Sequence, residues 1–377
     1  MVSTEDRERH ANNLELFLDL VFVFAVTQIA SLVAHDLTWS GVGRGALIAF
    51  LVWWQWSQYT WAGAAVDLQQ HAVSRLFVLG TIPATLTMAA AIPEAFHATG
   101  RWFGVAYLVV QLLVLLMQGG PALEQAATRV AFLRYESVAA VMPVVVAVGG
   151  FVAGNARLAA WVAAALLSIV SALRGASRGE WAINPVHFAE RHALFIIISL
   201  GEALVAIGAS ATEVGLSGRV LGGLVSAAFL AAVVWWMYFA YVPGETERHL
   251  RTTTPQNRAV EARDAFTFGH FPLVAGILAY AVVAKEVVRE PAHALDTGHR
   301  WLLAGALVLI VGSFIHLQWR IVRHVARERL VALPVLIAVC AVGRSVAGPY
   351  LVAITGAVLL VMHSISWRNF RRVSGPG

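Results

Sequence analysis

The sequence has very few residues that crosslink or solubilise a protein. Cys340 is the single cysteine, which excludes an intramolecular disulfide and a cysteine-based metal site. Charged residues make up 13% of the 377 residues, roughly half of the ~25% that is typical of a soluble domain. Lys285 is the only lysine, so the net charge of +5 comes from arginine. With 59% hydrophobic residues, this composition predicts a polytopic membrane protein.

The sequence also lacks the short motifs of common catalytic and nucleotide-binding sites. It has no P-loop, no Gly-x-Ser-x-Gly elbow and no Gly-x-Gly-x-x-Gly after a strand. It has no soluble basic domain, which excludes nucleic acid as a partner. The N-terminal stretch mixes acids with bases and has no small-residue cleavage site, so we expect no signal peptide. These absences predict no cofactor; they favour a non-enzyme but leave an enzyme activity open.

Long apolar segments dominate the rest of the chain. Each is close to the 17–25 residues that cross a bilayer as a helix. They predict an all-α membrane protein with about twelve transmembrane helices, joined by short connections. The expected spans are 14–34, 43–62, 74–91, 102–118, 133–153, 156–173, 193–212, 218–242, 265–285, 301–317, 330–347 and 349–366.

The basic residues are distributed unevenly between the two sides that these spans define. The N-terminus and the even-numbered connections, placed on one side, hold 19 of the 27 Lys and Arg residues. The positive-inside rule then puts both termini in the cytoplasm. We therefore expect a multi-pass protein of the cell inner (plasma) membrane, with the lipid bilayer as its main partner. Whether it forms a homo-oligomer stays open.

Two motifs recur in the second half of the chain. Val-Trp-Trp at 52–54 recurs 182 residues later, and the Phe-x-x-Gly-x-x-Pro motif that ends at Pro83 recurs 189 residues later. These landmarks keep the same order at similar offsets, which indicates duplication of a six-helix unit. Because six is even, the two copies should be parallel in the membrane. The predicted repeats are 1–173 and 174–377.

The segment 184–208 carries an ionisable cluster into an apolar helix. Asn184 suits the N-cap and Pro185 the first helical position. A charge as deep as Glu202 costs about 2.5–3.5 kcal/mol and usually faces a partner or a cavity. The polar cluster before Glu202 is either the start of a helix at the membrane–water interface or part of a functional site. It consists of His187, Glu190, Arg191 and His192. The two histidines are five residues apart, about 140° around a helix, so we predict no metal site.

The first apolar segment contains two acids on one helical face. Glu15 and Asp19 are four residues apart, and Phe22 follows them along that face. A buried Asp19 needs a partner, for which Arg75, Arg191, His187 or a helix end are the candidates. His270 lies two residues before Pro272, a proline inside a predicted span. The candidate pathway residues are Glu15, Asp19, Phe22, Glu202 and His270.

At these segments the chain resembles a known family. The stretches LELFLDLVFVFAVTQIA (14–30), WWQWSQYTW (53–61), HFAERHALFIIISLGEALVAIG (187–208), WWMYF (235–239) and HFPLVAGI (270–277) resemble the low-temperature-requirement A (LtrA) family of bacterial membrane proteins. The resemblance extends over nearly the whole chain. It implies a link to growth in the cold and a stress response, and it implies no settled biochemistry.

A shorter likeness concerns mechanism. Glu15 to Thr27 resembles the first-helix signature of the endosomal and lysosomal potassium channels, and Gly201 to Ile207 resembles another form of that signature. These channels are built from six-helix repeats whose first helices line the pore. The likeness implies that the first helix of each predicted repeat is central.

Three functions fit these observations. A channel-like or transporter-like conduit for a small cation, a proton or another solute fits the acids at matching places in the two predicted repeats. A membrane-embedded enzyme that handles or modifies lipids is the first alternative, and it would use the polar cluster at 187–192. A membrane sensor or scaffold without turnover is the second alternative.

Overall fold

The structure, a computed structural model, confirms the all-α class. Its regular elements are helices, and the described part of the chain contains no strand, only an isolated bridge between Ala294 and Ala347. The structure describes residues 10–65, 72–124, 126–175, 181, 183–323 and 325–374.

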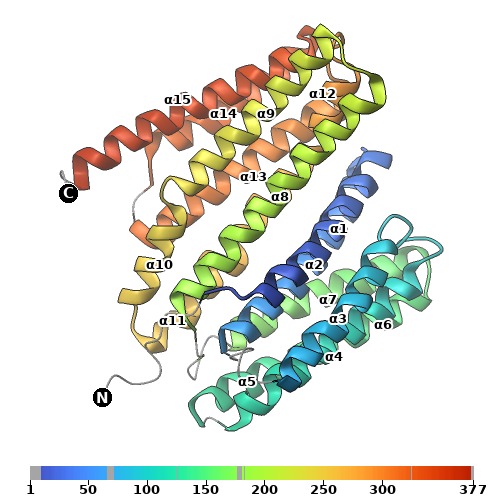
Figure 1. The fold of residues 1–377 in the computed structure, drawn as a ribbon, viewed down its shortest axis with the longest axis vertical. Coiled ribbons are helices and arrows are strands. Elements are labelled where there is room, and N and C mark those ends of the chain that lie inside the picture. The colour runs from blue at the N-terminus through green and yellow to red at the C-terminus, as the bar shows by residue number, and fades with distance from the viewer. Residues whose placement is uncertain are drawn as a thin grey trace. The chain divides into compact units, whose positions relative to one another are not determined.

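The helices follow one another with short connections (Figure 1). The first seven are α1 (Asn13–His35), α2 (Trp39–Ala65), α3 (Ala72–Ala90), α4 (Gly100–Glu124), α5 (Ala126–Ala139), α6 (Val141–Phe151) and α7 (Gly154–Gly175). The next are α8 (Pro185–Val214), α9 (Gly218–Phe239), α10 (Val242–Thr252), α11 (Pro255–Ala262) and the π-helix η2 (Arg263–Phe268). The last are α12 (Gly269–Arg289), α13 (Thr297–Val322), α14 (Arg327–Val342), the short 3₁₀ turn η3 (Gly343–Ser345) and α15 (Gly348–Ser374).

Ten helical segments among the described residues are long and apolar enough to cross a membrane. They include the continuous stretch Thr128–Phe151, which combines most of α5 with α6. Of the expected spans, α2 and α14 are not among the ten. α2 is interrupted by tryptophan, glutamine and serine, and α14 has only 16 residues. A multi-pass membrane protein is thus supported, while the count of twelve stays a prediction.

One expected span, 133–153, is divided into α5 and α6. The break is at Ala140, three residues before Pro143. A proline has no N–H and its ring clashes with the carbonyl four residues earlier, here that of Ala139. This accounts for the end of α5 at Ala139 and the new start at Val141.

The chain packs as two compact units. The first contains Met1–Leu32, Gly41–Phe195 and Gly244–Phe268, and the second contains Val33–Ser40, Ile196–Pro243 and Gly269–Gly377. In the first unit α4 packs against α3 and α6, and α7 packs against α5 and α6. In the second, α13 packs against α12 and α14, and α9 against α15. These units reflect packing and not duplication, so the two predicted six-helix repeats stay a prediction.

Glycines allow the closest helix crossings inside each unit. A Cβ on Gly104 of α4 would lie 2.8 Å from the backbone oxygen of Val146 on α6. In the second unit, a Cβ on Gly276 of α12 would lie 2.8 Å from the backbone oxygen of Ala306 on α13. Small residues at such crossings are typical of helix packing in membranes.

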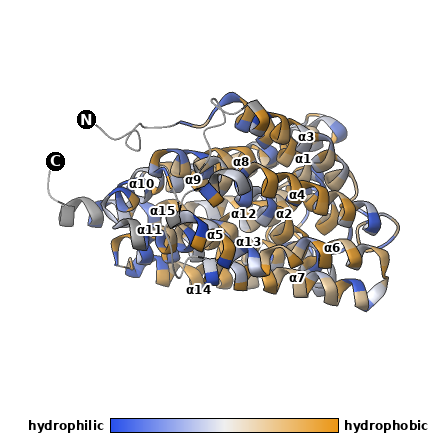
Figure 2. Cartoon of the chain, turned by 90° about the horizontal axis from the view of Figure 1, so that it is seen from below, coloured by the Kyte–Doolittle hydropathy of each residue, from blue (hydrophilic) through white to orange (hydrophobic). Residues whose placement is uncertain are grey.

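Many large apolar side chains point outward from the helices. Leu76 of α3, Val205 of α8 and Val331 of α14 are more than 60% exposed. Figure 2 shows that most of the helices consist largely of hydrophobic residues. Faces of this kind are stable against lipid chains and not against water.

Candidate functional site

The site with the most buried charge lies where α1 meets the N-terminal part of α8, within the first unit. Arg191 Nη1 donates a hydrogen bond to Asp19 Oδ2 at 2.7 Å, and Nη2 donates one to Asp19 Oδ1 at 2.9 Å. The Asp19 side chain is 0% exposed and the Arg191 side chain 1%. A bidentate pair of this kind is both strong and directional. Of the partners predicted for Asp19, the structure selects Arg191, while Arg75 is exposed.

Helix α2 supplies the third member of this cluster. Trp56 Nε1 donates a hydrogen bond of 2.8 Å to Asp19 Oδ1, and the Arg191 guanidinium lies 5.7 Å from the centre of a Trp56 ring. The indole therefore satisfies one more lone pair of the buried carboxylate and covers the cation. Two neighbouring tryptophans of α2, Trp53 and Trp54, are buried as well.

One helical turn before this pair, a second acid and base are in contact. His187 Nε2 lies 2.9 Å from Glu15 Oε1 and 3.1 Å from Glu15 Oε2. An ionised carboxylate only accepts hydrogen bonds, so Nε2 carries the proton in this contact. The other ring nitrogen of His187, Nδ1, is buried and has no hydrogen-bond partner in the described structure.

Glu15 is held in place by the start of its own helix. Asn12 Oδ1 accepts from the Glu15 N–H at 3.0 Å, and Glu15 Oε2 accepts from the Asn12 N–H at 3.0 Å. This reciprocal arrangement is a capping box. Gly63 of α2 faces the same carboxylate, and a Cβ there would collide with Glu15 Oε1. The glycine thus makes room for the Glu15–His187 contact.

The remaining members of the predicted polar cluster point elsewhere. His192 Nδ1 donates 2.8 Å to the backbone oxygen of Phe188, and its ring packs edge-on against Trp56 with centroids 5.0 Å apart. Glu190 accepts from the Ala11 N–H at 2.9 Å and contacts His10 at 3.3 Å, close to the surface. His187 and His192 therefore serve different neighbours and do not converge on one point.

The other predicted pathway residues are divided between the two units. Phe22 is fully buried on α1, three residues after Asp19. Glu202 is 9% exposed on the part of α8 that belongs to the second unit. His270, in the same unit, is 0% exposed, and its Nε2 lies 2.9 Å from the Tyr238 hydroxyl. Their membership of one pathway stays a prediction.

Sequence analysis missed Gly63 and the role of the Trp56 indole. It also missed the correspondence between the two contacts, although the sequence contains a signal for it. Glu15 and His187 are 172 residues apart, and so are Asp19 and Arg191. Two acids four residues apart on one helix can therefore pair with two bases four residues apart on a parallel helix. We call the two contacts, Glu15–His187 and Asp19–Arg191, the two rungs between α1 and α8.

One group of described side chains could hold a metal ion, and it lies in the second unit. The ligand atoms of Glu286, Asp296 and His299 all lie within 4.8 Å of one another. Local helix capping accounts for much of this cluster, because Asp296 Oδ1 accepts from the His299 N–H at 2.9 Å and Oδ2 lies 2.6 Å from His299 Nδ1. Partial burial alone would raise the pKa of Asp296, but these hydrogen bonds from His299 hold it below its usual value.

Comparison with known proteins agrees with the resemblance in the sequence. The family model described as "Bacterial low temperature requirement A protein (LtrA)" matches residues 10–364. The "Uncharacterized protein RA0937" of Rhizobium meliloti (strain 1021) is 29% identical over 365 residues, which are 92% of this chain and 87% of that protein. No solved structure gives a significant match. The chain belongs to the LtrA family of bacterial membrane proteins.

Proposed function

We propose that this LtrA family protein is a conduit or transporter of the cell inner membrane, and that its transport is linked to protonation of the Glu15–His187 pair. The observation that carries the proposal is the buried His187 Nδ1, which has no hydrogen-bond partner in the described structure, while Nε2 of the same ring contacts the Glu15 carboxylate. Histidine, glutamate and aspartate inside membrane helices commonly form proton relays.

The two rungs between α1 and α8 are suited to different tasks. Asp19 is held by two bonds from Arg191 and one from Trp56, so its charge is fixed in place. Glutamate and histidine side chains each have a protonated and a deprotonated form, so the Glu15–His187 contact can differ in the number of protons it holds. A fixed rung beside a titratable rung gives the interface two electrostatic states without unpacking it.

A proton can move through the titratable rung in simple steps. Neutral His187 donates Nε2–H to Glu15, and its Nδ1 lone pair accepts an incoming proton. The imidazolium then releases its Nε2 proton to the Glu15 carboxylate, which leaves a neutral imidazole with the proton on Nδ1. The hydrogen bond between the two side chains changes direction at this step, and the electrostatic attraction between α1 and α8 at this level is lost.

The lipid-modifying alternative receives less support from the site. Its candidate side chains, His187 and His192, are 3% and 1% exposed. The His192 ring is surrounded by Trp53, Trp56, Phe188 and Phe266. A lipid headgroup would have to displace several aromatic rings to reach these imidazoles, whereas a proton needs only the Nδ1 lone pair of His187. A sensor or scaffold without turnover has no particular observation in its favour.

The test is flux in liposomes reconstituted with the full-length protein. We expect proton flux, which a pH-sensitive dye inside the liposomes reports. K⁺ or Na⁺ is present in the buffer as the counter-ion that compensates the charge moved by the protons. His187→Gln should reduce this flux at least tenfold, while His293→Gln, at a histidine that is 75% exposed in its side chain, should leave it unchanged. Equal flux in His187→Gln and wild type would remove the basis of the proposal.

A further inference from the structure

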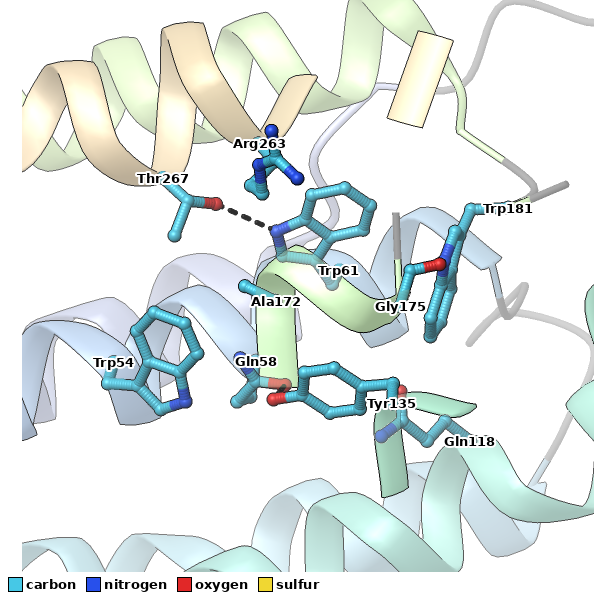
Figure 3. A pocket seen from close by; sticks show the side chains of 10 residues that line it. All are labelled: Trp54, Gln58, Trp61, Gln118, Tyr135, Ala172, Gly175, Trp181, Arg263 and Thr267. Atoms are coloured by element: carbon cyan, nitrogen blue, oxygen red, sulfur yellow. Dashed lines mark hydrogen bonds between the residues drawn. The ribbon is translucent and has the colours of Figure 1, made fainter. Parts of the chain in front are cut away.

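The first unit contains a pocket whose lining includes none of the four residues of the two rungs. It is partly open to its surroundings. Its walls are mainly aromatic, formed by Trp54 and Trp61 of α2, Tyr135 of α5 and Trp181 (Figure 3). Aromatic walls with a few polar groups are typical of sites for small organic molecules.

The polar groups of this pocket are mostly hydrogen-bond donors. Gln118 of α4 is 4% exposed, and its Nε2 has no hydrogen-bond partner in the described structure. The Trp54 indole N–H, also buried, is directed at the Tyr135 hydroxyl. Arg263 adds a guanidinium that is 12% exposed. A buried donor without an acceptor costs about 1–3 kcal/mol, so an acceptor on a ligand would be stabilised here.

Two acceptors in the pocket, the side-chain oxygens of Gln58 and Thr267, are already engaged. The Gln58 amide oxygen accepts from the Tyr135 hydroxyl at 2.6 Å. The Thr267 hydroxyl accepts from Trp61 Nε1 at 3.0 Å and lies 3.3 Å from the Ser57 hydroxyl. None of the described residues that line the pocket has a carboxylate. Asp264, outside the lining, pairs with Arg263 at 2.7 Å and leaves other guanidinium N–H groups for a ligand.

The backbone that carries Arg263 and Thr267 is itself unusual. Both residues belong to the π-helix η2, which precedes α12. Short π-helical segments are rare and occur frequently at functional sites, because the extra residue redirects side chains.

From these contacts we propose that the pocket binds a small organic anion with a flat apolar body and one carboxylate, and that this anion is a solute of the proposed conduit. The flat body would lie between the indole rings of Trp54, Trp61 and Trp181. The carboxylate would accept hydrogen bonds from Arg263. A quaternary ammonium ion also suits aromatic walls, but the Arg263 guanidinium and the absence of a lining carboxylate disfavour it. The assignment as a solute rests on the proposed function, whereas binding in the pocket does not.

Helix α2 links this pocket to the buried ion pair. Trp54, Gln58 and Trp61 line the pocket from one face of α2, and Trp53 and Trp56 lie on another face. Trp53 Nε1 donates 2.9 Å to the Thr267 backbone oxygen, and its ring is 4.9 Å from that of Trp56. A ligand that shifts Thr267 or Trp61 therefore acts on the helix that also holds Asp19.

The test is isothermal titration of the purified full-length protein with three probes of similar size. We expect benzoate to bind, with at least tenfold weaker binding of the neutral benzamide and of benzyltrimethylammonium. Arg263→Gln should weaken benzoate binding at least fivefold. Arg248→Gln on α10, at an arginine with a 68% exposed side chain, is the matched control and should bind as wild type does.

The probes decide the proposal even if the variants do not fold. Equal binding of benzamide, tighter binding of the ammonium ion, or no binding of benzoate to the wild-type protein would overturn it. The proposed function fails separately. If benzoate binds but liposomes show no proton flux, the proposed anion site stands and the proposed conduit fails. If liposomes show proton flux but benzoate does not bind, the conduit stands and the anion site fails.

Discussion

Arg191 holds Asp19 through two parallel hydrogen bonds, and both side chains are almost completely buried. Two opposite charges in such a place stabilise a fold only as a pair, because each one alone loses its hydration without compensation. The pair therefore fixes how α1 lies against the first part of α8. Its energetic signature should be strong coupling between the two positions.

We expect Asp19→Asn and Arg191→Met each to destabilise the protein by about 3–5 kcal/mol, since each leaves one buried charge without its partner. The double variant should lose much less than the sum. Melting temperatures of the four proteins in one detergent give the coupling energy. Additive losses would mean that the two side chains act independently.

The glycine that faces Glu15 offers a second test. Gly63→Ala puts a methyl group where Glu15 Oε1 now lies, so the carboxylate must move away from His187. We expect lower thermal stability and lower proton flux, with recovery when Glu15→Asp shortens the acid. Gly43→Ala in the same helix is the control, because no other atom lies within 4 Å of its added Cβ. A glycine-to-alanine change at such an open helical site stabilises by up to about 1 kcal/mol. Equal effects of the two changes would show that Gly63 makes no special room.

Helix α13 should show a dependence on pH at its first turn. Asp296 caps this helix, and its pKa is lowered in the folded protein by hydrogen bonds from His299. The ionised cap therefore stabilises the fold above the unfolded-state pKa of about 3.9, and this stability is lost as the pH falls through the lower folded-state value. Asp296→Ala should cost about 1 kcal/mol near neutral pH. The difference from wild type should shrink in strong acid, as measured by melting temperature from pH 7 to 3. A constant difference would contradict the role of the charge.

The predicted orientation can be checked by thiol labelling of intact cells. Cys340 is fully buried, so we expect the wild-type protein to react little with a membrane-impermeant maleimide. Thr297→Cys, at the first residue of α13, should be labelled from outside, and Ser374→Cys should not. Labelling of both from outside would rule out a cytoplasmic C-terminus, and labelling of neither would rule out the twelve-span layout.

Much of the site follows from local patterns in the sequence. Asn184 and Pro185 identify the start of α8, and Asn184 Oδ1 indeed accepts from the His187 N–H at 3.2 Å. Asp19 in an apolar helix required a partner, and Arg191 was one of four candidates. The final choice depends on which helices pack together, and a single sequence does not contain that information.

The pocket could not be predicted, because its walls come from segments far apart in the chain. Gln58, Gln118 and Tyr135 are isolated polar residues in apolar helices, and nothing in their spacing relates one to another. The π-helix around Arg263 was also unforeseen. Its geometry depends on one extra residue per turn, which composition and apolar periodicity do not reveal.

Because of the capping box, the backbone amide of Asn12 should report whether Glu15 is protonated. Glu15 Oε2 accepts the Asn12 amide N–H, and the same carboxylate contacts His187. A proton that reaches Glu15 weakens both contacts at once, so the first turn of α1 becomes more accessible to solvent. Deuterium uptake at the Asn12 amide, measured as a function of pH, would then report the protonation of the Glu15 carboxylate, which is buried.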